Sequence, residues 1–505
     1  MNPMPASSSL ETDSGAKIYS AGTLSYTKPA LAILFFWLLW GDFCYTLMEA
    51  VTGPIMNLKF AALGASNFER NLLVSVAPSL LYSAMAPVIA FRSDRYRGRL
   101  GRRIPFMIFS LPFLVFFLVV LAFGDKVGHG VFHLATPLIK GISVNQVVML
   151  TFAFILVVFT FFNTFVSTTF WYLFNDVVPE HLIARFFSLF RFISTLSTSL
   201  YYYAVFPSSA SHAREIFLGA AVLYAVGFGL MCFNVREGKY PPPAPYIGGG
   251  TGPIAAIRTF GAETHAFRHY LYLWINVFLG GISGATATSN LFFWLAIGLT
   301  MQQIGDIEFW FNIAVAVLTL GTGWLADRFH PIRVVLFGTF FSALVVYPAN
   351  LSWLLWHPAA NMIFWVALLI RLGFAAPSMA IANMWDPPFL MRYFPRSRYG
   401  QFCSVNGVWR MLGTILGATL VGIYLDVVGR WVGPQRAYFY LPFWNCLFVV
   451  PGIFLQLKLY ASWKSHGGDD HYEAPVITGN TMEEEKVMVP DLTPELVVAA
   501  ESRED

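Results

Sequence analysis

Residues 93–103 read Ser-Asp-Arg-Tyr-Arg-Gly-Arg-Leu-Gly-Arg-Arg and follow a long apolar run of the chain. Residues 323–333 read Gly-Trp-Leu-Ala-Asp-Arg-Phe-His-Pro-Ile-Arg and follow another apolar run. Both stretches place Asp-Arg at the end of the run and a further arginine before the next one. Two later connections between apolar runs also match each other. The first has Val178-Pro179 followed by Arg185-Phe186-Phe187-Ser188, and the second has Phe394-Pro395 followed by Gln401-Phe402-Cys403-Ser404. This recurrence predicts two related halves.

The composition indicates what the apolar runs are. The 505 residues are 56% hydrophobic and only 12% charged, whereas soluble domains carry about 25% charged residues. A spanning helix needs about 20 mostly apolar residues, and the chain offers about twelve such runs. We place them at residues 29–51, 68–91, 104–124, 146–173, 183–206, 215–233, 270–298, 307–326, 331–354, 359–384, 399–425 and 437–461.

Lys and Arg predict the orientation of these spans. They gather in the even-numbered connections, including six arginines between residues 92 and 103, and basic loops remain in the cytoplasm. Both termini are therefore expected to be cytoplasmic, in a plasma or inner membrane. The net charge of +4 gives no argument for nucleic acid.

The polar stretches suggest the domain boundaries. We expect a disordered cytoplasmic N-terminus at 1–27, a six-helix bundle at 28–233 and a cytoplasmic linker at 234–269. A second six-helix bundle follows at 270–461, and a disordered cytoplasmic tail at 462–505. The first 27 residues lack the pattern of a removable signal peptide, so the first apolar run is expected to remain as a helix.

At these residues the chain resembles a known family. Asp94-Arg95 with Gly101-Arg102-Arg103 resembles the loop signature of the major facilitator superfamily, and Asp327-Arg328 resembles its weaker second copy. Residues 93–106 and the join at 178–187 are similar to the glycoside–pentoside–hexuronide:cation symporters and the related sucrose–proton symporters. The resemblance covers residues 28–461. It implies an all-α integral membrane fold of about twelve transmembrane helices in two six-helix pseudo-repeats. His330-Pro331 departs from the pattern of the second copy.

The loop signature suggests a gate. A carboxylate at a helix end can pair with arginines, and breaking such a pair can release one conformation for another. We expect this role for Asp94, Arg95, Arg102 and Arg103, and for Asp327 and Arg328 in the second copy. The alternative is that the arginines only set topology or bind anionic lipid.

Two acids in the first span are candidates for cation coupling. Glu49 follows Asp42 by seven residues, which is nearly two helical turns, so both share a face about 10 Å apart along the axis. A charged group in a span is costly and is a functional hypothesis by default. The family resemblance also implies that acids in the first helices serve coupling. Alternatively, Asp42 pairs with a buried arginine and Glu49 reaches water.

Substrate-binding candidates lie deeper in the later spans. Arginine presents a planar fork of donors that fits carboxylates and neighbouring hydroxyls, so we expect Arg191, Arg371 and Arg410 to bind substrate, or alternatively to form fixed salt bridges. Amide and indole groups suit the edges and faces of sugars. Four residues of this kind, which can also be interfacial anchors, are Asn163, Trp171, Asn383 and Trp385.

These patterns favour a secondary active transporter that carries a sugar or glycoside together with a proton or sodium ion by alternating access. The alternatives are an exporter of drugs or metabolites, or a non-transporting receptor with a transporter fold. The sequence has no nucleophile–histidine pairing, phosphate-binding glycine loop or strong metal motif, so we expect no enzyme activity, cofactor or metal. The expected partners are a small-molecule substrate, a coupling cation and membrane lipid, with the protein a monomer.

Overall fold

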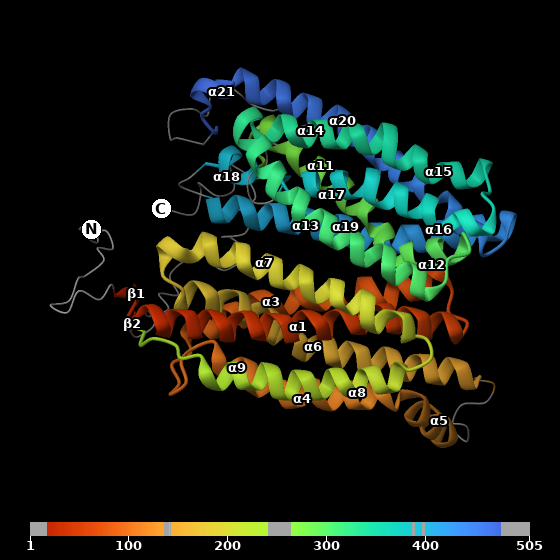
Figure 1. Cartoon of the computed structure of the whole chain (residues 1–505), viewed down its shortest axis with the longest axis horizontal. Coiled ribbons are helices and arrows are strands. Elements are labelled where there is room, and N and C mark those ends of the chain that lie inside the picture. Colours follow the sequence, from red (N-terminus) through yellow and green to blue (C-terminus); the bar gives the residue numbers. More distant parts are fainter. Residues whose placement is uncertain are drawn as a thin grey trace, which may run out of the picture.

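The computed structural model describes residues 18–135, 141, 143–240, 264–385, 389–395 and 399–475, apart from the side chains at 135, 180, 184, 323, 326, 327, 400, 401 and 470. The polar N-terminus up to residue 17, the linker at 241–263 and the tail from 476 lie outside the described residues. The rest is almost entirely helical (Figure 1). The first part of the chain and the second part form two bundles that lie against each other.

The first bundle begins after a short hairpin of β1 (Tyr19–Ala21) and β2 (Leu24–Tyr26), paired antiparallel with Tyr19 opposite Tyr26. Its passes are α1 (Lys28–Ala62), α2–η1–α3 (Asn67–Asn71, Leu72–Val76, Ala77–Arg95), α4 (Ile104–Ala122), α6 (Val144–Val177), α7–η3–η4 (Ile183–Leu200, Tyr201–Val205, Phe206–Ser208) and α8–η5–α9 (Ala213–Leu223, Tyr224–Phe228, Gly229–Asn234). Two short helices connect them, α5 (Gly124–Ala135) and η2 (Glu180–Leu182).

The second bundle repeats this plan. Its passes are α11–η6–α12 (Arg268–Gly284, Ala285–Ser289, Asn290–Ala296), α13 (Met301–Phe329), α14–η7–α15 (Pro331–Phe341, Ser342–Val346, Tyr347–Leu355), α16–η8–α17 (Ala360–Leu369, Ile370–Ala375, Ala376–Ala382), α19 (Tyr399–Val432) and η11–α20 (Arg436–Tyr440, Leu441–Ser465). The short helices α18 (Leu390–Tyr393) and α21 (Gly468–His471) lie beside them.

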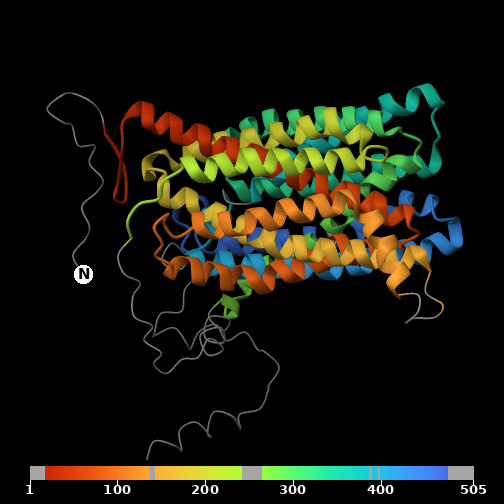
Figure 2. The same cartoon turned by 90° about the horizontal axis from the view of Figure 1, so that it is seen from below.

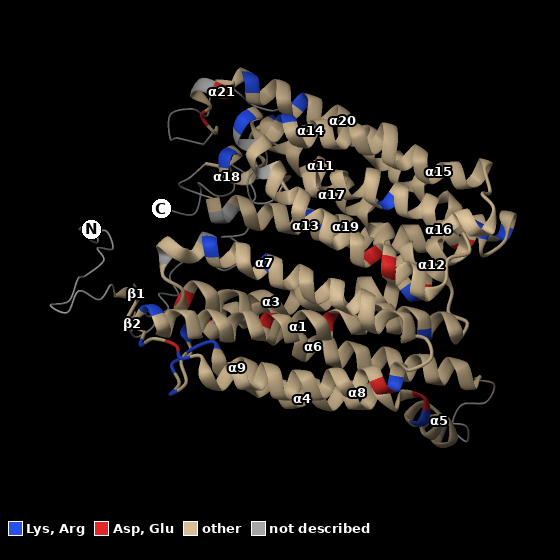
Figure 3. Ribbon diagram, viewed as in Figure 1, with Lys and Arg blue, Asp and Glu red and all other residues tan. Residues whose placement is uncertain are grey.

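Eleven of these passes are long and apolar enough to cross a membrane. The twelfth pass is α7 with η3 and η4, in which Arg185, Arg191 and several Ser and Thr lower the apolar content. The prediction of an all-α integral membrane protein is therefore confirmed. Figure 3 shows that charged residues lie mostly toward the two ends of the helices. Charged side chains are costly in the hydrocarbon between those ends.

Some of the described helices begin where side chains bind free backbone N–H groups. Capping boxes start three helices, with Ser66 and Glu69 at α2, Ser143 and Gln146 at α6, and Thr300 and Gln303 at α13. In such a box each side chain accepts a hydrogen bond from the other residue's backbone. Five passes also contain a π-helical segment, namely η1, η3, η5, η7 and η8. Such segments often occur at functional sites, and η8 carries Arg371.

Both described chain ends lie at one end of the bundle, here called the termini face, and the turns at 63–66, 209–212 and 297–300 lie at the opposite face (Figures 1 and 2). The hairpin at 19–26 falls in a segment expected to be disordered, but Thr23 Oγ1 accepts a hydrogen bond of 2.8 Å from Lys239 N. The start of the expected tail is also ordered: Tyr472 bonds to His269 and to the Tyr393 carbonyl, both at 2.8 Å. Local docking contacts therefore order both segments.

Glycines allow α11 and α19 to approach closely. A Cβ at Gly413 would lie 2.2 Å from the Phe278 carbonyl oxygen, and one at Gly281 would lie 2.6 Å from the Arg410 carbonyl oxygen. The atoms that would clash belong to backbone, so the helices would have to separate. Small residues bring membrane helices together in this way.

We predict that Gly413→Ala lowers the thermal unfolding midpoint of the purified protein, because overpacking a close contact costs about 1–3 kcal/mol. Gly407→Ala on the same helix is the matched control, since a Cβ there would meet nothing within 4 Å. The control should leave the midpoint unchanged or raise it slightly. Equal midpoints for the two variants would contradict the packing argument.

Candidate functional site

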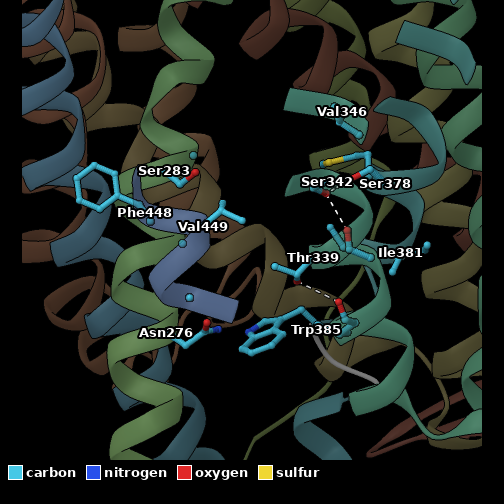
Figure 4. A pocket seen from close by; sticks show the side chains of 18 of the residues that line it. Asn276, Ser283, Thr339, Ser342, Val346, Ser378, Ile381, Trp385, Phe448 and Val449 are labelled. Atoms are coloured by element: carbon cyan, nitrogen blue, oxygen red, sulfur yellow. Dashed lines mark hydrogen bonds between the residues drawn. The ribbon is translucent and has the colours of Figure 1, made fainter. Parts of the chain in front are cut away.

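A cavity with a volume of about 610 Å³, the larger of the two described here, lies within the second bundle. Its walls come from α11, α13, α14–η7–α15, η8–α17, α19 and α20, and Figure 4 shows side chains that line it. Hydroxyl and amide groups recur on these walls, from Asn276, Ser283, Thr339, Ser342, Tyr347, Ser378, Thr414 and Gln456. Gln456 is 8% exposed, and its Oε1 has no hydrogen-bond partner. The cavity thus offers many polar contacts to a solute.

Three of the residues predicted from sequence line this larger cavity together: Arg371, Arg410 and Trp385. They come from three different segments, η8, α19 and the residues after α17. None of the described residues that line the cavity is acidic. The lining therefore combines two cations, neutral hydrogen-bonding groups and an aromatic surface, which suits a polyhydroxylated or anionic solute.

The smaller cavity, of about 380 Å³, lies between the bundles and nearer the opposite face. The first bundle contributes Asn57 of α1 and Tyr202 of η3, and the second contributes Asn290, Trp294 and Glu308 among others. Arg371 lines both cavities. This arginine therefore stands where the two cavities meet.

Arg371 forms an ion pair with Glu308 of α13. The distance from Arg371 Nη2 to Glu308 Oε2 is 2.8 Å, and Glu308 is 8% exposed. The guanidinium carbon also lies 3.6 Å from the ring centre of Phe311. Glu308 is not among the site residues predicted from sequence, although it falls inside the predicted span 307–326 and an acid within a span is itself a signal.

Asp42 is almost completely buried between α1 and α7, with 1% of its surface exposed. Ser194 Oγ donates to one carboxylate oxygen at 2.7 Å and Thr46 Oγ1 to the other at 3.2 Å. Arg191, one turn before Ser194, acts on Asp42 through its charge and is exposed. Asp42 thus has hydroxyl partners and a nearby cation.

Glu49 lies further along α1 and is exposed, although the adjacent Met48 is buried. Its Oε1 accepts hydrogen bonds from Tyr45 Oη at 2.6 Å and from Asn163 Nδ2 at 3.1 Å. Asn163 is therefore a partner of Glu49. Neither residue lines the two cavities described above.

The remaining sugar-binding candidates lie elsewhere. Trp171 is 40% exposed and stacks on Phe187 with ring centres 6.2 Å apart. Asn383 Nδ2 donates to Thr319 Oγ1 at 3.4 Å. These two residues are not among those that line either cavity. The structure therefore does not bring all the predicted polar and aromatic residues to one place.

The loop signature forms a charge network within the first bundle. Arg103 pairs with Asp94 and, at 3.1 Å, with Asp176 at the end of α6, and Arg102 also pairs with Asp176. Hydrogen bonding to Asp176 raises the pKa of Arg102. Arg95 lies over Phe91, with its guanidinium carbon 5.3 Å from the ring centre. Arg102 and Arg103 therefore bind carboxylates of the first bundle.

Glu237, just after α9, joins this network. Its carboxylate accepts backbone hydrogen bonds from Arg102 at 2.9 Å, Arg103 at 2.8 Å and Ile104 at 2.7 Å. A carboxylate at a helix N-terminus is favourable because the free N–H groups carry partial positive charge. Glu237 therefore ties the chain after the sixth pass to the start of α4. No spacing along the chain identifies Asp176 or Glu237 as partners of these arginines.

The second copy of the signature differs. The Asp327 side chain lies outside the described residues, and Arg328 is exposed with its guanidinium carbon 5.5 Å from the Trp324 ring centre. His330, which departs from the pattern of the loop signature, has a φ of 64°. Its Nδ1 accepts a hydrogen bond from Ile332 N. Burial lowers the pKa of His330 to about 4, which keeps this acceptor neutral. The turn is thus held by a histidine cap.

The two bundles bind each other at the opposite face through a contact that we call the interlock, formed by Asn67, Phe68 and Arg70 with Asp426 and Tyr438. Asp426 accepts from Asn67 N at 2.9 Å, Asn67 Nδ2 at 2.7 Å and Phe68 N at 3.0 Å. The buried Arg70 donates to Tyr438 Oη at 2.6 Å. The interlock therefore joins the bundles at the opposite face, with a carboxylate of one bundle on a helix N-terminus of the other.

Solved structures share this fold at low sequence identity. One is a bacterial homologue of the human lysosomal transporter Spinster, at 14% identity and a TM-score of 0.58, covering 86% of this chain and 97% of that one. A D-xylose–proton symporter has 15% identity and a TM-score of 0.54, covering 84% and 96%. A bacterial homologue of the iron transporter ferroportin, in its inward-facing state, has 13% identity and a TM-score of 0.56. The match covers 85% of this chain and 99% of that one.

These likenesses establish the architecture. The chain has the twelve-helix major facilitator fold of its structural neighbours. No protein-family model and no curated protein matches the chain.

We predict that Asp426→Ala opens the opposite face. Hydrogen bonds to a charged group contribute about 1.5–3 kcal/mol each, and a loss of 1.4 kcal/mol already shifts a two-state population about tenfold. Spin labels on Ala62→Cys and Gln435→Cys would report the distance across this face by pulsed electron resonance. The variant should populate longer distances. Asp306→Ala is the control, because Asp306 bonds to Gln302 on its own helix; equal distributions for both variants would contradict the role of the interlock.

Proposed function

We propose that the protein is a secondary active transporter that couples entry of a sugar or glycoside to a proton or sodium ion by alternating access. The observation that carries this proposal is the pair of cavities that meet at Arg371, one in the second bundle and one between the bundles. In a twelve-helix transporter fold, solute sites lie near the middle of the membrane and the two halves rock about them.

The larger cavity supports a sugar or glycoside as the solute. Hydroxyl and amide groups can bond to the edge of a sugar ring, and Trp385 can stack on its face. Arg371 and Arg410 can bind neighbouring hydroxyls, or the carboxylate of a sugar acid. The D-xylose–proton symporter among the structures of the same fold is consistent with this class of solute.

The acids of α1 supply the cation-coupling groups in this proposal. A carboxylate that is held by hydroxyl groups within a span can bind a proton or sodium ion, and the bound cation removes its charge. Asp42 is placed between α1 and α7 by Ser194 and Thr46, so its charge state acts directly on the contact between these two helices. Glu49, which is exposed, provides a second acid on the same helix.

Gating is assigned to the charged contacts at the two faces. The interlock closes the opposite face, while the network of Asp94, Arg95, Arg102 and Arg103 lies within the first bundle at the termini face. Asp327 and Arg328 hold the equivalent place in the second bundle. We propose that the termini face lies in the cytoplasm of a plasma membrane, which the arginines of its loops support, and that each chain acts as a monomer.

Transport of labelled sucrose, D-xylose and D-glucuronate into proteoliposomes tests the function. An inward proton gradient should accelerate uptake of at least one of these solutes and drive its accumulation. Binding without flux would instead indicate a receptor. Uptake of none of the three, with no binding, would remove the sugar-symport proposal.

We predict that Asp42→Asn retains solute binding but loses gradient-driven accumulation. Asparagine keeps the hydrogen-bonding shape of Asp42 but cannot exchange a proton or bind a cation by charge. The measurement is accumulation under an imposed gradient beside equilibrium solute binding. Asp125→Asn is the control, because Asp125 forms an exposed pair with Lys59. Accumulation by Asp42→Asn equal to that of the control would remove Asp42 from coupling.

A further inference from the structure

The ion pair of Glu308 and Arg371 separates the two cavities. Arg371 lines both of them, whereas Glu308 lines only the smaller one. The smaller cavity lies toward the opposite face, where Asn57 Nδ2, which also lines it, donates to the Thr288 carbonyl of the second bundle at 2.6 Å. The Glu308–Arg371 pair therefore lies between the larger cavity and the opposite face.

We propose that Glu308 is a proton-binding site that controls, through Arg371, the passage of solute between the two cavities. This inference rests on the proposed transport function. It assigns a role to an acid of the second bundle, in addition to the acids of α1.

The surroundings of the pair support this role. From the described elements packed against α13 near Glu308, the ionisable groups that face it are Arg371 of η8 and Tyr202 of η3, and Tyr202 interacts electrostatically with both. On α13 itself, Asp306 is held by Gln302. Glu308 is the one acid among the described residues that line the smaller cavity. A proton that reaches this cavity has a single carboxylate there to bind.

Protonation changes what Arg371 can bind. A buried ion pair is held by the attraction of its two charges, and removing one charge leaves the other in need of a partner. The proton adds to a Glu308 carboxylate oxygen, and no other bond forms or breaks. Arg371 keeps its charge and its place over Phe311, and its Nε is buried without an acceptor. A solute in the larger cavity can then supply the acceptors that the guanidinium loses.

Coupling follows from this exchange of partners. If solute and Glu308 compete for Arg371, bound solute favours protonation of Glu308, and protonation favours bound solute by the same factor.

The Glu308–Arg371 pair also lies at the contact between the two bundles. A Cβ at Gly305, one turn before Glu308, would lie 2.4 Å from the Tyr202 carbonyl oxygen of the first bundle. Release of the pair therefore occurs where the two bundles meet.

Infrared difference spectra between mildly alkaline and mildly acidic pH test proton binding on the purified full chain in lipid nanodiscs. The carbonyl stretch of a protonated carboxyl should appear on acidification, and Glu308→Gln should lack one component of it. Asp306→Asn is the matched control, two residues away on the same helix, and should keep that component. Identical spectra for Glu308→Gln and the unmodified protein would overturn the proposal, whether or not any solute is transported.

Exchange of sucrose, D-xylose and D-glucuronate across proteoliposomes, without a gradient, tests the effect on passage. In the unmodified protein, exchange of the transported solute should slow as the pH rises, because the charged Glu308 holds Arg371 in the ion pair. Glu308→Gln should exchange at the acidic-pH rate throughout, and Glu308→Asp should restore pH dependence. A pH dependence that survives in a stably folded Glu308→Gln would overturn the control of passage. Absence of exchange in the unmodified protein would instead refute the proposed function.

Discussion

Hydrocarbon gives a charged side chain no partner, and this constraint shapes the whole molecule. Charges collect at the helix ends, and those within the passes contact specific partners. Glu308 and Arg371 hold each other, Asp42 is held by Ser194 and Thr46, and Glu49 by Tyr45 and Asn163. Each of these charges therefore lies where two helices, or a helix and a cavity, come together, and a change in charge must change the contact.

The two faces of the bundle are held by different kinds of contact. At the opposite face the interlock joins the bundles, with Asp426 on the N-terminus of α2 and Tyr438 on Arg70. At the termini face the network of Asp94, Arg102, Arg103 and Asp176 stays within the first bundle. Breaking the interlock would free one bundle to move against the other without dismantling the first bundle itself. The two bundles can therefore rock against each other while the polar network within the first bundle stays intact.

Much of the fold could be predicted from sequence, because length and apolar content report membrane passes directly. The predicted span 104–124 becomes α4 at Ile104–Ala122, and 331–354 becomes the pass from Pro331 to Leu355. The residues of the candidate site were harder to predict. Arg371, Arg410 and Trp385 converge on one cavity, but Asn163 and Trp171 do not line it. Which face a polar residue presents depends on π-helical segments such as η8, which shift helix register in ways that spacing alone does not reveal.

Partners were hardest to predict, because they are distant in sequence. Asp176, Glu237 and Asp426 meet their partners only after the passes have packed.

The proposed function requires that solute and cation cross the membrane together. Adding the transported sugar outside lightly buffered proteoliposomes, with no imposed gradient, tests it most directly when external pH is recorded. We expect the outside to become more alkaline as protons enter with the sugar, or, for a sodium-coupled carrier, labelled sodium to enter instead. Sugar entry with neither ion movement would contradict it.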